Sequence, residues 1–75
     1  MIDGPTLQDR VIAAALDGAD HGRVDRACVL DQGLEPDEEM ALEAMSELEV
    51  LPEHPRLLRV FRRAYVAAFL GDDEE

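Results

Sequence analysis

The alternation of apolar and polar positions is clearest over residues 55–70. On a helix, which turns about 100° per residue, seven apolar or small residues of this stretch fall in one arc. They are Leu57, Leu58, Phe61, Ala64, Tyr65, Ala68 and Phe69. Pro55 suits a first helical turn, and Gly71 suits the position just after a helix end. The pattern therefore predicts a helix over 55–70 with this face in the core.

Three earlier stretches carry similar helical patterns, over residues 6–17, 21–32 and 36–51. Thr6 and Asp9 have the spacing of a capping box, and Gly18 and Gly33 are read as helix stops. In the second stretch the apolar stripe contains Val24, Ala27, Cys28 and Leu30, with Val29 off the stripe. Cys28 is thus expected to be a small core residue.

No stretch shows the period of two that is typical of a strand. The sequence predicts an all-α, compact bundle of four short helices over 6–17, 21–32, 36–51 and 55–70. Residues 1–71 are expected to form a single helical domain. Residues 72–75 are expected to be a disordered acidic tail, because four acids beyond a helix C-terminus oppose its dipole.

Charge is distributed unevenly along a chain whose net charge is −11. Residues 31–53 contain nine acids and no Lys or Arg, whereas residues 54–71 contain four Arg and no acid. Opposite charges favour placing the acidic third helix antiparallel to the basic fourth helix. The acidic balance disfavours direct contact with nucleic-acid phosphates, which attract dense Lys and Arg.

Candidate chemistry is sparse. His21 and His54 are distant in the sequence, and Cys28 is the only cysteine. These spacings do not match zinc or EF-hand calcium patterns, and no nucleophile motif or glycine-rich phosphate loop is present. We expect no catalytic, metal or cofactor residue, no small-molecule substrate and no enzyme activity.

The sequence also carries signals of cellular location. The N-terminal residues lack the features of a signal peptide, and no run of about 18 apolar residues predicts a membrane span. A single thiol is typical of a reducing compartment. The sequence therefore predicts a cytoplasmic protein without a membrane partner.

Two sets of residues within 37–70 have the spacings of known helix-pair motifs. The spacings of W-x₂-L-G-x₂-Y are held by Leu58, Phe61, Arg62 and Tyr65. Those of A-x₃-F…P are held by Met40, Ala44 and Pro52, and Tyr65 and Pro52 match the consensus letters. Residues 37–70 therefore resemble one tetratricopeptide repeat. The resemblance implies a protein-binding scaffold without catalysis.

The leading hypothesis is a small helical protein-interaction module, an adaptor, chaperone-like binder or regulator that also self-associates. Val66 and Leu70 lie off the main apolar face, among arginines. The predicted partner-binding residues are Arg59, Arg62, Arg63, Val66 and Leu70. The arginines would attract an acidic partner or the acidic row of a second copy.

Two alternatives follow from the charges. An acidic inhibitor, such as an immunity protein or nucleic-acid mimic, would block a basic site on its target through Glu39, Glu43, Glu47 and Glu49. A DNA-binding regulator would use the Arg-rich last helix, against the repulsion of the surrounding acids.

Overall fold

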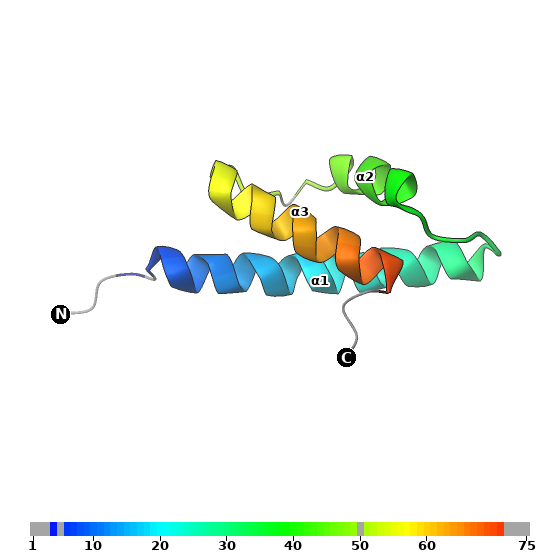
Figure 1. The fold of residues 1–75 in the computed structure, drawn as a ribbon, viewed down its shortest axis with the longest axis horizontal. Coiled ribbons are helices and arrows are strands. Elements are labelled where there is room, and N and C mark those ends of the chain that lie inside the picture. The colour runs from blue at the N-terminus through cyan, green and yellow to red at the C-terminus, as the bar shows by residue number, and fades with distance from the viewer. Residues whose placement is uncertain (1–3, 5, 50, 72–75) are drawn as a thin grey trace.

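A computed structural model describes residues 4, 6–49 and 51–71. The expected tail over 72–75 lies outside these residues, as do residues 1–3, 5 and 50. The described residues form three α-helices and no strand: α1 (Leu7–Asp31), α2 (Glu38–Ser46) and α3 (Pro55–Leu70) (Figure 1). The all-α class is therefore confirmed, whereas the prediction of four helices is wrong.

The error lies at residues 17–21, where one continuous helix replaces the two predicted over 6–17 and 21–32. Gly18 and Gly22 are buried inside α1, one turn apart on the face that packs against α3. A Cβ atom on Gly18 would lie 2.4 Å from the backbone oxygen of Phe61. The glycine at position 18 thus permits a close helix crossing, and tertiary packing offsets its low helix propensity.

The ends of α1 follow local capping chemistry. The Thr6 hydroxyl accepts from the Asp9 amide at 3.1 Å, and the Asp9 carboxylate accepts from the Thr6 amide at 3.4 Å, which confirms the capping box. At the other end, Gly33 takes a positive φ of 79°, which only glycine adopts without strain. The predicted stop at Gly33 is therefore correct.

The continuous helix also changes which side of its second half faces inward. Val24, Ala27, Cys28 and Leu30 are exposed, whereas Val29 is half-buried beside the core. The expectation that Cys28 is a core residue is wrong. The inward direction is set by the buried Gly22, and residues 25 and 29 continue its face at helical spacing.

α2 is shorter than the predicted helix over 36–51, because it begins at Glu38 and ends at Ser46. Asp37 is the N-cap, and its carboxylate accepts from the Met40 amide at 2.8 Å. Pro52 disfavours helical backbone at Leu51 alone, so it does not account for the end of α2 at Ser46. α2 packs mainly on α3, in contrast to the extensive contact between α1 and α3.

Replacing Asp37 by alanine should therefore destabilise α2. The nine-residue helix loses the acceptor for one of its first amides, and such N-cap losses cost about 0.5–2 kcal/mol. Hydrogen exchange at the amides of α2 should accelerate more than exchange in α1. Glu35→Ala, which alters an exposed acid outside the cap, is the control. Unchanged exchange in α2 would contradict the capping role.

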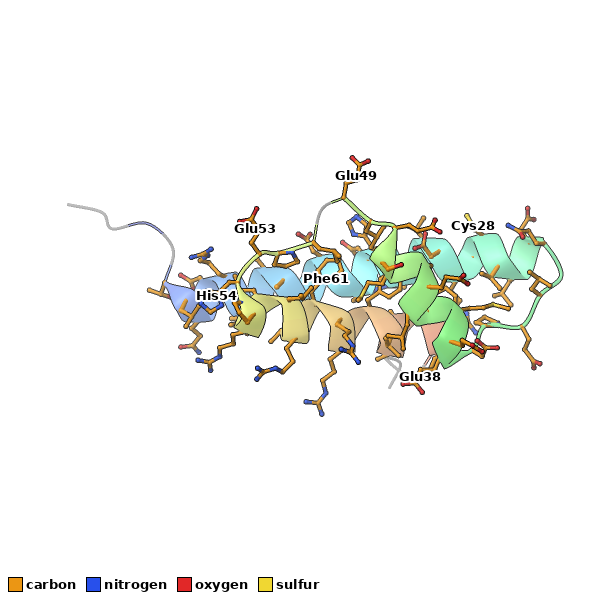
Figure 2. The ribbon with its side chains drawn as sticks, turned by 90° about the horizontal axis from the view of Figure 1, so that it is seen from above. Cys28, Glu38, Glu49, Glu53, His54 and Phe61 are labelled. Atoms are coloured by element: carbon orange, nitrogen blue, oxygen red, sulfur yellow. The ribbon has the colours of Figure 1, made fainter. Side chains whose placement is uncertain are left out.

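α3 has the predicted bounds and forms the centre of the core. Phe61, Tyr65 and Phe69 are almost completely buried, and their rings follow one another along α3 with centroids 6.4 and 5.9 Å apart. Leu57 and Ala68 are buried on the same side. Ala14 of α1 and Ala41 and Met45 of α2 complete the buried apolar set. Figure 2 shows Phe61 within this packing.

Candidate functional site

A groove lies between α2 and the outer side of α3, with a volume of about 370 Å³. It is lined by Glu38 and Leu42 from α2 and by Arg59, Arg62, Arg63, Val66, Ala67 and Leu70 from α3. All five residues predicted to bind a partner thus lie around one groove. Figure 2 places Glu38 at the N-terminal end of α2.

The groove forms because α3 carries apolar residues on two sides. Its main apolar face is used by the core, while Val66, Ala67 and Leu70 are only half-buried. The half-buried Leu42 of α2 lines the same groove. These four side chains make the groove partly apolar, so a ligand with apolar side chains would remove their surface from water.

Arginines form the polar part of the groove. The side chains of Arg59, Arg62 and Arg63 are exposed. Among the described residues, none of the three makes a hydrogen bond or an ion pair. No ion pair joins α2 to α3 in this part of the chain, although α2 runs back towards the start of α3 in Figure 1. The guanidinium groups can therefore bind carboxylates of another molecule, which they hold well through two parallel hydrogen bonds.

The sequence pattern did not predict three of the residues that line the groove, Glu38, Leu42 and Ala67. Leu42 lies off the predicted inward face of its helix, as Val66 and Leu70 do in α3. An apolar residue outside the predicted inward face is thus the sequence signal that could have identified Leu42 as a groove residue. Which off-face residues meet depends on how α2 is placed on α3, and helical periodicity does not contain this information.

The residues of the alternative acidic surface are distributed over three places. Glu39 and Glu43 line a hollow on α2 together with Asp37 and Met40. Glu47 caps the C-terminus of α2 and lines a crevice that Cys28 and Phe69 also border. Glu49 is exposed beyond the helix, and Figure 2 shows it pointing away from the helices. Only Glu39 and Glu43 share one hollow.

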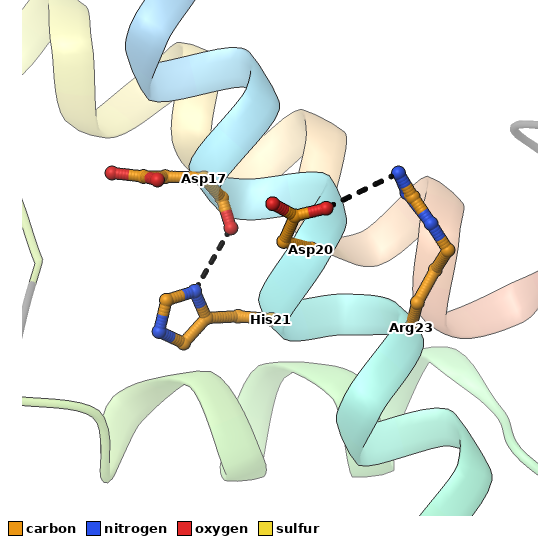
Figure 3. A network of polar contacts seen from close by, with 4 residues as sticks. All are labelled: Asp17, Asp20, His21 and Arg23. Carbon is orange, nitrogen blue, oxygen red and sulfur yellow. Dashed lines mark hydrogen bonds and ion pairs between the residues drawn. The ribbon is translucent and has the colours of Figure 1, made fainter.

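The polar side chains near residue 20 contact groups in both α1 and α3. Nδ1 of His21 donates to the backbone oxygen of Asp17 at 2.9 Å, and Arg23 pairs with Asp20 at 3.4 Å (Figure 3). Asp25 accepts a hydrogen bond from the hydroxyl of Tyr65. In the described part of the chain, no group of three or more His, Cys, Asp or Glu residues could hold a metal ion.

Tyr65 and Asp25 form a polar contact between α3 and α1. Burial raises the pKa of the Tyr65 hydroxyl above its ordinary value, and the hydrogen bond to Asp25 and the negative charge of Asp25 raise it further. The neutral hydroxyl donates, so the bond requires Tyr65 to remain protonated. This contact positions α1 on α3 and lies outside the groove.

Comparison with known proteins adds no relative: no protein-family model, curated protein or solved structure matches the chain. The resemblance of residues 37–70 to a tetratricopeptide repeat therefore rests on the spacings alone. Among the described helices, none is both long and apolar enough to cross a membrane.

Proposed function

We propose that this protein is a non-catalytic interaction module whose groove binds an acidic segment of another protein. The observation that carries the proposal is the position of three unpaired arginines around a partly apolar groove, within the described structure. An amphipathic helix with acidic and apolar side chains fits this chemistry, because helices commonly bind grooves through apolar residues at i, i+3 and i+4. The groove lies between the acidic α2 and the basic α3. The sequence analysis expected opposite charges to favour packing of these two helices against each other.

A reducing compartment suits this module. Cys28 is the only cysteine and its side chain is exposed, and exposed thiols persist unoxidised where glutathione and thioredoxin keep them reduced. We therefore propose a cytoplasmic location.

The experiment is affinity capture from the native lysate with the wild-type chain, followed by titration of the identified partner against variants. We expect Arg62→Glu or Arg63→Glu to weaken binding about tenfold or more, because each replaces an attractive charge by a repulsive one. Leu70→Glu should weaken binding by about 30-fold, the loss typical of an apolar anchor. Unfolding curves should accompany each titration, since Leu70 also packs against the core.

Matched controls separate this groove from the acidic surface. Glu43→Gln removes one charge on the exposed side of α2 and should leave the affinity of the groove ligand nearly unchanged. A partner that is lost with Glu39→Gln and Glu43→Gln, and kept with Arg63→Glu, would instead favour the acidic-inhibitor alternative. A mobility shift of labelled duplex DNA at low salt would favour the DNA-binding alternative. Either result would contradict the proposal.

A further inference from the structure

The exposed apolar side chains of the protein are concentrated on one helix. The described residues include six large apolar side chains that are exposed, and five of them belong to α1 and one to the segment that follows it. They are Leu7, Ile12, Leu16, Val24, Leu30 and Leu34. Neither α2 nor α3 contributes one. Leu7 lies beside Arg56 of α3, whereas Ile12, Leu16 and Leu30 share a second side of α1 that the single chain does not cover.

This second side faces away from the other helices. Ala14, Gly18 and Gly22 define the inward face of α1, and Figure 1 shows α2 and α3 on the same side of α1. Ile12 and Leu16 are one helical turn apart and are 53% and 61% exposed. At about 100° per residue, Ala27 and Leu30 continue the same outward strip in the second half of the helix. We call Ile12, Leu16, Ala27 and Leu30 the outer strip.

A pair of opposite charges interrupts the outer strip at its middle. Asp20 and Arg23 are ion-paired at 3.4 Å, and their side chains are largely exposed (Figure 3). They lie between the apolar pair Ile12 and Leu16 and the apolar pair Ala27 and Leu30. The order along the strip is therefore apolar, acidic, basic, apolar.

We infer that the outer strip is the interface of a two-fold symmetric dimer, in which α1 packs antiparallel against α1 of a second copy. A two-fold axis beside Asp20 and Arg23 brings each aspartate level with the arginine of the other copy. The same axis places Leu16 level with Ala27 of the second copy, and Ile12 near its Leu30. A symmetric contact needs a self-complementary surface, and this order of residues is self-complementary.

Charge selects the antiparallel direction. A parallel pair in register would place Asp20 against Asp20 and Arg23 against Arg23, and would also align the two helix dipoles unfavourably. The antiparallel pair removes both repulsions. The contact can extend along a helix of 25 residues, which is about 37 Å long, and it leaves the groove between α2 and α3 open.

The inference does not depend on the proposed function of the groove. Sedimentation equilibrium of the full chain, over a concentration series reaching high micromolar, should give twice the 8.3 kDa mass of the chain. Leu16→Glu should raise the dimer dissociation constant about tenfold or more, because it places a charge in the apolar contact. Arg62→Gln, in the groove, should leave it unchanged.

Charge exchange tests the centre of the interface. Asp20→Arg and Arg23→Asp should each weaken the homodimer, because each places like charges opposite one another across the axis. An equimolar mixture of the two variants should form a heterodimer more tightly than either variant pairs with itself. Failure of the mixture to associate preferentially would contradict the pairing of Asp20 with Arg23 of the second copy.

The relative direction of the two α1 helices and the response of the dimer to salt provide the remaining tests. Spin labels on Ala13→Cys in a Cys28→Ser background should lie about 25 Å apart along the helix axis, whereas a parallel pair would bring them side by side. The dimer should persist at high salt, since each chain carries a net charge of −11 and salt screens the repulsion between chains. A monomer at all concentrations or adjacent labels would overturn the inference.

Discussion

Replacing Gly18 or Gly22 by alanine should destabilise the fold, although alanine is the better helix former. A Cβ atom at position 18 would lie 2.4 Å from the Phe61 backbone oxygen, and one at position 22 would lie 2.5 Å from that of Tyr65. Backbone atoms cannot rotate away as a flexible side chain can, so α1 and α3 must separate. We expect a net loss of about 1–3 kcal/mol for each variant, the usual cost of inserting a methyl group into a packed interface.

The sign of this effect makes it informative. At an exposed helical site, Gly→Ala adds about 1 kcal/mol of stability. Ala13→Gly, on the exposed side of α1, should reveal the size of that propensity term in this protein. Urea unfolding followed by circular dichroism should show lower midpoints for Gly18→Ala, Gly22→Ala and Ala13→Gly. A rise in stability for either glycine variant would mean that α1 and α3 do not approach this closely.

The double variant Gly18→Ala/Gly22→Ala should lose most of its cooperative unfolding transition. A core in a chain of this length supplies only about 3–5 kcal/mol, and the two losses act on the same α1–α3 contact. Unfolding is best measured at one fixed protein concentration, because a dimer would add concentration-dependent stability.

The second large effect concerns the hydrogen bond between Tyr65 and Asp25. Asp25→Ala leaves the hydroxyl of a fully buried tyrosine without its acceptor, and such an unsatisfied group costs about 1–3 kcal/mol. Tyr65→Phe should cost less, because the half-buried carboxylate that remains can still reach water. The double variant should be more stable than the sum of the single losses implies, which measures the coupling between the two residues. Asp20→Ala, an exposed aspartate on the same helix, is the control for Asp25→Ala.

The same bond predicts how stability depends on alkaline pH. The pKa of Tyr65 is raised in the folded protein, above the ordinary value of about 10, so the folded state binds the phenolic proton more tightly than the unfolded state. The stability that this tighter proton binding adds is fully present below a pH of about 10. It is lost as the pH rises towards the pKa of Tyr65 in the folded protein. The free energy of unfolding should then fall by up to about 1.4 kcal/mol per pH unit.

Tyr65→Phe is the test of that assignment. The variant lacks the ionisable hydroxyl, so its free energy of unfolding should change much less between pH of about 10 and about 12 than that of the wild-type chain. If the free energy of unfolding fell equally with pH in both proteins over this interval, groups other than Tyr65 would cause the loss of stability at alkaline pH. The ultraviolet absorbance of the single tyrosine gives a direct readout of its ionisation in the wild-type chain.

α3 could be predicted from the sequence because all of its signals are local and agree. Pro55 begins it, Gly71 ends it with a φ of 82°, and its apolar residues repeat at helical spacing. The capping residues Thr6 and Asp9 and the stop at Gly33 could be predicted for the same reason, and so could the position of Val66 and Leu70 among arginines on one side of α3. Each depends on its neighbours in the sequence or on the face of one helix.

Tertiary structure decided the rest. A glycine that ends a helix and a glycine that lets two helices approach are identical as local signals, and only the position of α3 distinguishes them at Gly18 and Gly22. That contact turned Val24, Cys28 and Leu30 to the solvent and brought Asp25 to Tyr65. The placement of α2 beside α3 is a second tertiary feature, and it brings Leu42, Val66 and Leu70 to one groove. Helical periodicity specifies faces, whereas the packing of one face against another depends on backbone approach over distances that local sequence does not encode.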